Sequence, residues 1–263
     1  MQPALELKAR IHARKLTTGV LVTDHLWPQF VEIAQAAGLD YIIIDCEHQP
    51  HSAEAVSLVC ATGRLAGLPV LIRPNQTTDT AVRAALDLGP CGLLLPNVED
   101  AAHLDMVRSA AWLPPRGNRR PGGPGNRWVN AFNYEGFRST VEDHLIVIPQ
   151  IESPSALERA DEIAAHELTT ALGLGPFDLS AQLGICGAPV DHPQMLSALA
   201  TWQAAAERAD KPTWMIGPGA KLVEMGFRFI CLGEPGMLLT QALHRQVNDL
   251  QHAVGSTRAD SHG

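Results

Sequence analysis

The segment YIIIDCEH, residues 41–48, sets four consecutive apolar residues directly before Asp45, Cys46, Glu47 and His48. A short apolar run without alternation is typical of a strand that protein covers on both faces, as in a parallel sheet. The runs GLLL (92–95) and LIVI (145–148) have the same character. The sequence therefore predicts a buried parallel sheet in which polar side chains follow the apolar strands.

Such apolar runs alternate along the chain with longer segments that carry Ala, Leu and Val at helical spacing. We predict strands at 16–22, 41–45, 69–73, 91–96, 145–151, 169–174, 212–216 and 227–232, and helices at 28–37, 53–66, 78–88, 101–111, 155–165, 193–209 and 219–225. Eight strand–helix units in about 250 residues are what a closed (β/α)8 TIM barrel requires. A doubly wound open sheet is the alternative, but no glycine cluster follows TTGVLVT (17–23) to mark its first turn.

The overall composition excludes several classes of protein. The 263 residues include 28 Asp and Glu against 20 Lys and Arg, and a net charge of −8 argues against partners such as nucleic acid or an anionic membrane. No apolar run approaches the roughly 20 residues of a membrane span, and residues 1–16 lack the apolar core of a signal peptide. The five cysteines form no CxxC pair, as expected for reduced thiols. We expect a cytoplasmic protein with one domain at 1–255 and a flexible tail at 256–263.

In a barrel, the polar side chains at the carboxyl ends of the strands converge on one face. These ends carry Asp45, Glu47, His48, Arg73, Gln150, Glu152 and Asp178. Glu152 and Asp178 either share a hard cation such as Mg²⁺ or Mn²⁺ or merely cap the helices that follow. His48 is either a general base or a buried, hydrogen-bonded histidine. Arg73 meets either a substrate anion or a nearby glutamate, Glu47 or Glu152.

Two long segments lack a regular pattern, 113–133 and 184–192, and we expect both on the face that carries the chemistry. The first contains Arg116, Arg119, Arg120 and Arg127 among glycines and prolines, and it forms either an anion-binding lid or a solvated loop. Gly175 and Pro176 open a further helix, whose first backbone N–H groups are suited to a carboxylate.

Six separated motifs resemble one known family in their order and spacing. They are IIIDCEHQPHS (42–52), LIRPN (71–75), GPCGLLLPNVEDA (89–101), LPPRGNRRPGG (113–123), IPQIESPSALE (148–158) and GLGPFDLSAQLG (173–184). Over residues 19–243 the chain resembles the HpcH/HpaI class II pyruvate aldolases. The resemblance implies a (β/α)8 barrel whose C-terminal helix packs on a neighbouring subunit in a homohexamer, a dimer of trimers. It also implies a carbon–carbon lyase that needs Mg²⁺, Mn²⁺ or Co²⁺ and joins pyruvate or hydroxypyruvate to an aldehyde.

The same resemblance implies roles for individual residues. His48 corresponds to the family's catalytic base and Arg73 to the arginine that steadies the enolate oxygen. Gln150 corresponds to a substrate-binding amide, and Glu152 and Asp178 correspond to the metal ligands. No lysine stands at a predicted strand end, which disfavours a Schiff-base aldolase.

By the same resemblance, Asp87 corresponds to the family's aspartate that raises the basicity of the catalytic histidine, here His48. It lies at a predicted helix C-terminus, at the opposite end of the barrel from His48. Asp87 would therefore reach a histidine only in a neighbouring subunit, which implies a composite active site. Asp45 is the alternative partner within the chain.

The chain departs from the family pattern at several positions. Cys46 stands where glycine is common in the family. Phe177, two residues after Gly175, stands where alanine is common beside the bound keto acid, and its phenyl ring is expected to reshape the pocket. The residues Arg119-Arg120-Pro121 replace an Arg-Gly pair, with an expected effect on aldehyde recognition. Two alternative functions are a lyase of the malyl-CoA or citryl-CoA type and a catalytically silent barrel that binds keto acids.

Overall fold

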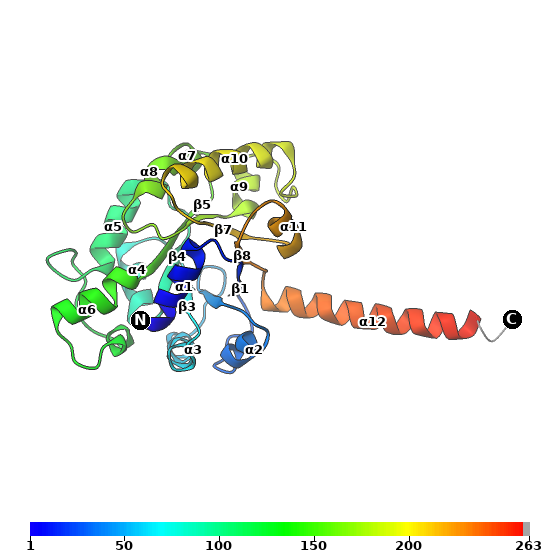
Figure 1. Cartoon of the computed structure of the whole chain (residues 1–263), viewed down its shortest axis with the longest axis horizontal. Helices are drawn as coiled ribbons and strands as arrows, with labels where there is room; N and C mark the ends of the chain where they lie inside the picture. Colours follow the sequence, from blue (N-terminus) through cyan, green and yellow to red (C-terminus); the bar gives the residue numbers. More distant parts are fainter. Residues whose placement is uncertain (260–263) are drawn as a thin grey trace.

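The computed structural model describes residues 1–259, within which parallel strands β1 to β8 close a barrel in sequence order (Figure 1). The strands are β1 (Thr17–Val22), β2 (Tyr41–Asp45), β3 (Val70–Arg73), β4 (Gly92–Leu95), β5 (Ile146–Ile151), β6 (Leu172–Leu174), β7 (Thr213–Ile216) and β8 (Phe229–Cys231). The register of the first three strands places Ile44 of β2 beside Val22 of β1 and Ile72 of β3. The predicted (β/α)8 architecture is confirmed.

Helices surround the strands and return the chain from one end of the barrel to the other (Figure 1). They are α1 (Gln2–His12), α2 (Phe30–Ala36), α3 (Ala53–Ala66), α4 (Asp79–Asp87), α5 (Ala101–Ala111), α6 (Tyr134–Thr140), α7 (Pro154–Glu158), α8 (Ala160–Ala165), α9 (Pro176–Gln182), α10 (Pro193–Arg208), α11 (Gly219–Glu224) and α12 (Pro235–Ala259). The helix predicted at 155–165 is divided at Arg159 into α7 and α8.

Helix α3 shows how local sequence fixes the ends of an element. Ser52 caps its start, because the Ser52 hydroxyl accepts a hydrogen bond from the backbone N–H of Ala55. Gly67 ends it in the left-handed region, with φ of 77°, where a residue without Cβ is favoured. The helix therefore begins just after His48 at one end of the barrel and delivers the chain to β3 at the other.

The strands differ little from their predicted bounds, and β6 differs most. It begins at Leu172 instead of 169. Just before it, Thr170 bonds to β5 twice, because its N–H donates to the Val147 carbonyl and its hydroxyl accepts from the Val147 N–H. The Thr169 hydroxyl instead donates to the Ile163 carbonyl in α8.

The barrel interior is filled by large side chains below the polar ends of the strands. Tyr41 and Trp214 are fully buried, and the Trp214 indole N–H donates to the Tyr41 hydroxyl at 2.9 Å. The Tyr41 hydroxyl in turn donates to the Ile230 carbonyl at 2.9 Å. These two hydrogen bonds satisfy the buried Trp214 indole and Tyr41 hydroxyl, and the two side chains form the floor below the polar residues.

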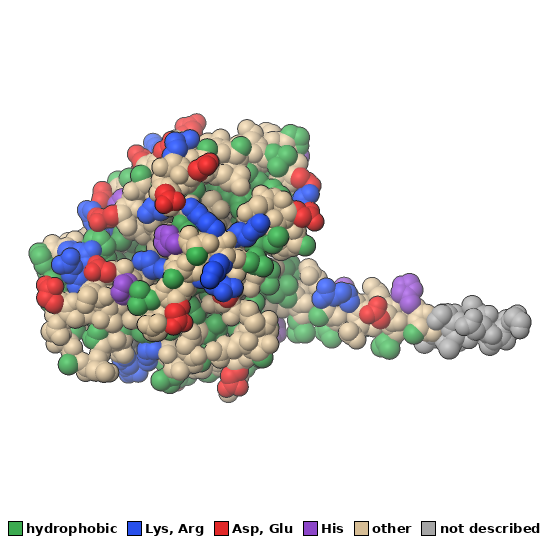
Figure 2. Space-filling model, viewed as in Figure 1, with side chains coloured by type: hydrophobic (Ala, Val, Ile, Leu, Met, Phe, Trp, Pro, Cys, Tyr) green, Lys and Arg blue, Asp and Glu red, His purple; other side chains and the backbone are tan. Residues whose placement is uncertain are grey.

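Helix α12 leaves the barrel and extends away from it (Figure 1). Leu239, Leu243, Val247 and Leu250 are exposed along it, and their spacing places them on one face of the helix. Hydrophobic side chains also gather where this arm leaves the barrel (Figure 2). The helix continues to Ala259, past the domain boundary expected at 255, and 260–263 of the expected tail lie outside the described residues.

No helix within residues 1–259 is both long enough and apolar enough to cross a membrane.

Candidate active site

A cavity of about 360 Å³ opens at the carboxyl ends of the strands. It is lined by Leu21, His48, Arg73, Gln150, Glu152, Gly175, Pro176, Phe177, Asp178, Trp214, Ile216 and Glu234. The structure thus brings together most of the side chains that the sequence singles out, from β2, β3, β5 and the start of α9. Because the barrel is closed, residues as far apart in sequence as Leu21 and Glu234 line one cavity.

Arg73 is buried at the end of β3, and its guanidinium forms two hydrogen bonds with Asp45 at the end of β2. Nε donates to Oδ1 and Nη2 donates to Oδ2, each at 2.8 Å. Although burial opposes ionisation of Asp45, the hydrogen bonds and charge of Arg73 hold the pKa of this carboxyl below its usual value. Arg73 Nη1 also lies 3.3 Å from Glu47 Oε2. The guanidinium is therefore a fixed positive charge at the cavity wall.

His48 is exposed at the rim and contacts the same buried pair. Its Nδ1 lies 3.2 Å from Asp45 Oδ2 and 2.9 Å from Arg73 Nη2. Because a guanidinium only donates, Nδ1 accepts from Arg73 Nη2 when it is unprotonated and donates to Asp45 Oδ2 when it carries the ring proton, so the two contacts belong to different tautomers. The intrachain contact that the sequence offered as an alternative, Asp45 with His48, is thus present in the geometry.

Glu152 is buried at the end of β5, where backbone groups position its carboxylate. The N–H of Asn97, which follows β4, donates to Glu152 Oε2 at 2.7 Å. Asn97 takes a positive φ of 52°, a conformation that asparagine tolerates better than most residues. On the other side Gly175 lies so close that a Cβ there would overlap Glu152 Oε1. The carboxylate therefore has little freedom to move.

Three carboxylates, those of Glu47, Glu152 and Asp178, interact electrostatically at this end of the barrel. Burial raises the pKa of Glu152 to about 7, and the charges of Glu47 and Asp178 act in the same direction. Burial also raises the pKa of Glu47, with Asp45 and Asp178 adding to the effect and Arg73 and His48 opposing it. Mutual repulsion of this kind is relieved by a cation placed among the carboxylates.

The donor set fits a hard divalent cation. Glu152 and Asp178 supply carboxylate oxygens, which Mg²⁺ and Mn²⁺ prefer. The Gln150 Oε1 acceptor, which is buried beside them, has no hydrogen-bond partner within the described part of the chain. An unpartnered acceptor in a polar cavity indicates a group that a ligand completes.

Asp45, Glu47 and His48 form a second possible cation group among the described residues. Their ligand atoms lie within 4.8 Å of one another. However, both Asp45 oxygens already accept hydrogen bonds from Arg73, so an ion there would face the guanidinium directly. Electrostatics therefore favour the side of the cavity that holds Glu152 and Asp178.

Asp87 lies far from the cavity of its own chain, at the end of α4, where the chain enters β4. There the buried Arg119 donates to Asp87 Oδ1 at 3.0 Å. This is the opposite end of the barrel from His48, as the sequence indicated.

The prediction that 113–133 covers the face with the chemistry is wrong within one chain. This segment follows α5, which has already returned the chain to the amino-terminal end of the barrel. Arg116 there binds Glu142 and Asp143 at 3.1 and 2.8 Å, and Arg119 binds Asp87. Arg116 and Arg119 thus bind acidic groups at this end of the barrel, and neither binds Glu152 or Asp178 of the same chain.

Sequence reasoning missed two residues that shape the site. Asn97 acts through its backbone N–H on Glu152, and its side chain lies 3.4 Å from Glu47 Oε1. Glu234 follows β8 and lines the cavity. Both occupy positions just after strands, so a search of every strand end, including β4 and β8, would have found them.

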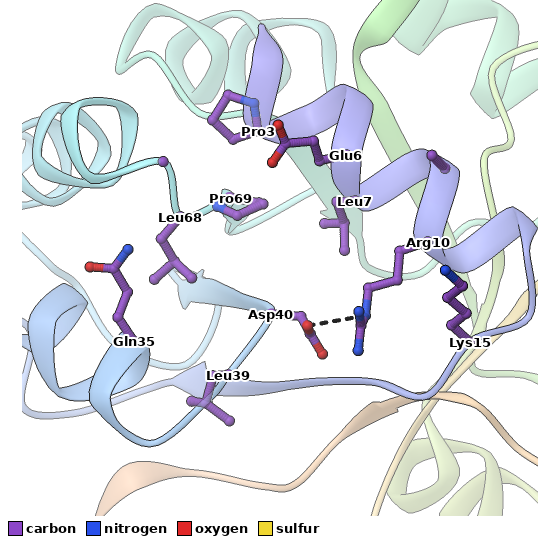
Figure 3. A pocket seen from close by; sticks show the side chains of 12 residues that line it. Pro3, Glu6, Leu7, Arg10, Lys15, Gln35, Leu39, Asp40, Leu68 and Pro69 are labelled. Carbon is purple, nitrogen blue, oxygen red and sulfur yellow. Dashed lines mark ion pairs between the residues drawn. The ribbon is translucent and has the colours of Figure 1, made fainter.

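A larger hollow of about 620 Å³ lies at the other end of the barrel, between α1 and the starts of β2 and β3. Figure 3 shows Arg10 and Asp40 pointing toward each other in it, with Leu7, Leu39 and Leu68 nearby. Their ion pair is 3.0 Å long, and Asp40 also accepts a hydrogen bond from the N–H of Thr18. These contacts attach α1 to the strands, so Arg10 and Asp40 have a structural role in this hollow.

Comparison with known proteins identifies relatives of the whole barrel. The profile of a family described as HpcH/HpaI aldolase/citrate lyase matches residues 25–214. Two relatives, from Shigella boydii serotype 4 and from Escherichia coli K12, are each 30% identical over 221 residues and are named 2-keto-3-deoxy-L-rhamnonate aldolase. The match covers 82% of this chain and 82% of each relative.

Solved structures show the same architecture. An HpcH/HpaI aldolase from Desulfitobacterium hafniense DCB-2 has a TM-score of 0.85 at 28% identity, covering 93% of this chain and 96% of its own. A protein described as HpcH/HpaI aldolase/citrate lyase family, from Burkholderia cenocepacia J2315, has a TM-score of 0.82 at 25% identity, with 94% and 99% covered.

Proposed function

The chain belongs to the HpcH/HpaI aldolase/citrate lyase family and is an aldolase of the carbon–carbon lyase class, and from this we propose how it acts. Each group in the cavity has a role in the proposed reaction. The substrates are 4-hydroxy-2-oxo acids, which the enzyme cleaves to a keto acid and an aldehyde or forms from them. The observation that carries this proposal is the cavity itself, which Arg73, His48, Glu152 and Asp178 all line.

Cleavage of the C3–C4 bond leaves negative charge on the keto acid as an enolate, and stabilising this charge is the main task of the site. Glu152 and Asp178 would hold the divalent cation, which when bound supplies a Lewis acid for the keto acid oxygens. Arg73 adds a second positive charge, fixed by its two bonds to Asp45. Loss of one such preorganised group typically costs on the order of 100–1000-fold in rate.

His48 is the proposed base for the C4 hydroxyl proton. In the tautomer whose Nδ1 donates to Asp45, Nε2 is the nitrogen that accepts the proton as the bond breaks. Gln150 and the backbone of Gly175 are proposed to bind the keto acid, beside Phe177. Because Gln150 Oε1 has no partner within the described residues, it is free to orient a bound group.

Asp87 is proposed to act on His48 of a neighbouring subunit, in a homohexamer built as a dimer of trimers. The apolar face of α12 supports contact with a second chain, because four exposed aliphatic side chains line it. Size-exclusion chromatography with light scattering tests this. Leu243→Asp is expected to reduce the assembly size, whereas Gln241→Asp, on the opposite face of α12, is expected to leave it unchanged. A cytoplasmic location accords with this assignment.

Metal removal tests the central proposal. The assay measures cleavage of 2-keto-3-deoxy-L-rhamnonate as pyruvate released. Cleavage is expected to stop after treatment with EDTA and to recover with Mg²⁺, Mn²⁺ or Co²⁺. Full activity after exhaustive chelation would contradict the role of Glu152 and Asp178. Turnover of malyl-CoA without any turnover of hydroxy-oxo acids would favour the thioester lyase instead.

A further inference from the structure

A second hollow of about 440 Å³ adjoins the cavity of the site. It is lined by Pro176, Phe177, Ser180, Gly187, Ala188, Pro189, Val190, Asp191, Ile216, Gly217, Pro218 and Lys221. Pro176, Phe177 and Ile216 line both spaces, so they form the boundary between them. The two spaces are therefore neighbouring parts of one depression at the carboxyl end of the barrel.

The second hollow differs from the first in chemistry. Its wall is formed largely by aliphatic groups, including Ala188, Val190 and Ile216. Its ionic side chains, Asp191 and Lys221, lie 3.5 Å apart and neutralise each other. Such a space favours an uncharged, apolar occupant, since a charged group would lose its hydration without gaining a partner.

The order of the strands shows which part of a substrate can reach this hollow. His48 follows β2, whereas Phe177 and Asp178 follow β6, and these strands lie on opposite sides of a closed barrel of eight. The C4 hydroxyl must lie at His48 and the keto acid oxygens at Glu152 and Asp178. A group that enters the hollow beyond Phe177 therefore extends from the keto acid half of the substrate, away from the aldehyde half.

Phe177 is the side chain that separates the two spaces. Its ring is 66% exposed, so it lies on the surface of the depression and is not held within the core. A large aromatic side chain in this place adds apolar area on which an alkyl group can pack.

We propose that this hollow binds an apolar substituent on C3 of the keto acid donor, so that the enzyme uses 2-oxo acids longer than pyruvate. This inference rests on the proposed aldolase function and specifies its donor. In cleavage the C3–C4 bond breaks and its electron pair forms the enolate, while the C4 hydroxyl proton passes to His48. Carbon C4 leaves as the aldehyde, and a proton returned to C3 gives the substituted 2-oxo acid.

Exchange of C3 hydrogens for deuterium tests the donor without any aldehyde, because exchange requires only the enolate. The enzyme with Mg²⁺ is incubated in D₂O with pyruvate or 2-oxopentanoate, and NMR follows the loss of the C3 proton signal. Each buried methylene contributes roughly fourfold in affinity. Because 2-oxopentanoate has two more methylenes than pyruvate, we expect its kcat/KM for exchange to be about fifteenfold higher.

Ala188→Leu fills the hollow and is expected to lower the ratio of the two kcat/KM values about tenfold. Ala181→Leu makes the same change on α9 outside both spaces and is expected to leave the ratio unchanged. Thermal unfolding confirms that each variant is folded, and Val190→Phe replaces Ala188→Leu if that variant is not.

The outcomes separate the two proposals. Exchange of pyruvate alone, or a ratio that Ala188→Leu does not change, overturns the donor site and leaves the aldolase function intact. Exchange of neither acid in a folded, Mg²⁺-loaded protein overturns the enolate chemistry and the donor site with it. Preference for 2-oxopentanoate that disappears in Ala188→Leu supports the inference.

Discussion

Arg73 and Asp45 meet through two parallel hydrogen bonds, Nε to Oδ1 and Nη2 to Oδ2, at the ends of adjacent strands. Both side chains are buried, with Asp45 at 0% and Arg73 at 6% exposure. The pair has two effects, because it fixes the guanidinium at the cavity wall and places a carboxylate under His48. Changing either residue removes the two-bond partner of the other buried charge, which then retains an ion-pair contact with Glu47 in the case of Arg73 or with His48 in the case of Asp45.

Asp45→Ala tests this pair. Removal of one member of a buried ion pair costs about 3–5 kcal/mol, so the free energy of unfolding should fall by that amount. Because the pKa of Asp45 is lowered in the folded protein, this contribution is present above its ordinary pKa and is lost as acid protonates it. Urea unfolding at pH 7 measures the effect. Asp161→Ala, which breaks the exposed pair with Arg208, should cost less than about 1 kcal/mol.

Glu152 should make the metal-free protein less stable as the pH rises. Its pKa is about 7 in the folded protein, above its ordinary value, so its stabilising contribution is complete below the ordinary value and is lost as pH rises through about 7. At pH 8 with EDTA, Glu152→Gln should unfold with a free energy roughly 2–4 kcal/mol higher than the wild type. The exposed Glu158→Gln is the control. An equal pH dependence in wild type and Glu152→Gln would refute this assignment.

Gly175→Ala should displace the Glu152 carboxylate, because the new methyl group would overlap Oε1. We expect the dissociation constant for Mn²⁺, measured by calorimetry, to rise at least tenfold, together with a loss of about 1–3 kcal/mol in stability. Gly122→Ala is the matched control, since nothing lies within 4 Å of a Cβ at that position. Unchanged Mn²⁺ binding in a folded Gly175→Ala protein would exclude Glu152 as a ligand.

Mixed assemblies distinguish the two aspartates proposed as partners of His48. If Asp87 acts across subunits, His48→Ala and Asp87→Asn are each inactive, but mixed subunits regain activity, because some sites combine an intact His48 with an intact Asp87. A mixture of His48→Ala with Asp45→Asn should regain none, since both residues belong to the same site of one chain. Restored activity only in the second mixture, or in neither, is the result that excludes the composite site.

Much of the fold follows from the sequence for a simple physical reason. Strands such as Ile42–Ile44 are buried on both faces, so their residues are apolar without alternation and stand out from the helices. The ends of the same strands carry the polar groups, and closure of the barrel brings them together. For this reason the sequence predicts Arg73, Glu152 and Asp178 on one face, and all three line the same cavity.

Other features depend on information that residue types do not carry. Asn97 positions Glu152 with a backbone N–H, a group that every residue except proline has. The length of the segment 113–133 and its lack of a regular pattern predict a loop on the face with the chemistry, and this prediction is wrong within one chain. The predicted helix at 101–111, however, had already turned the chain back to the other end. Direction along the barrel, and not composition, decides which loops meet the site.

Helix α12 extends from the barrel with an uncovered aliphatic face. Most helices in proteins are stabilised by the surface on which they pack and less by their own propensity. Helix α12 should therefore lose helical structure when the protein is diluted far enough to separate the chains. Ellipticity at 222 nm would then depend on protein concentration, an unusual property that makes secondary structure itself a measure of association.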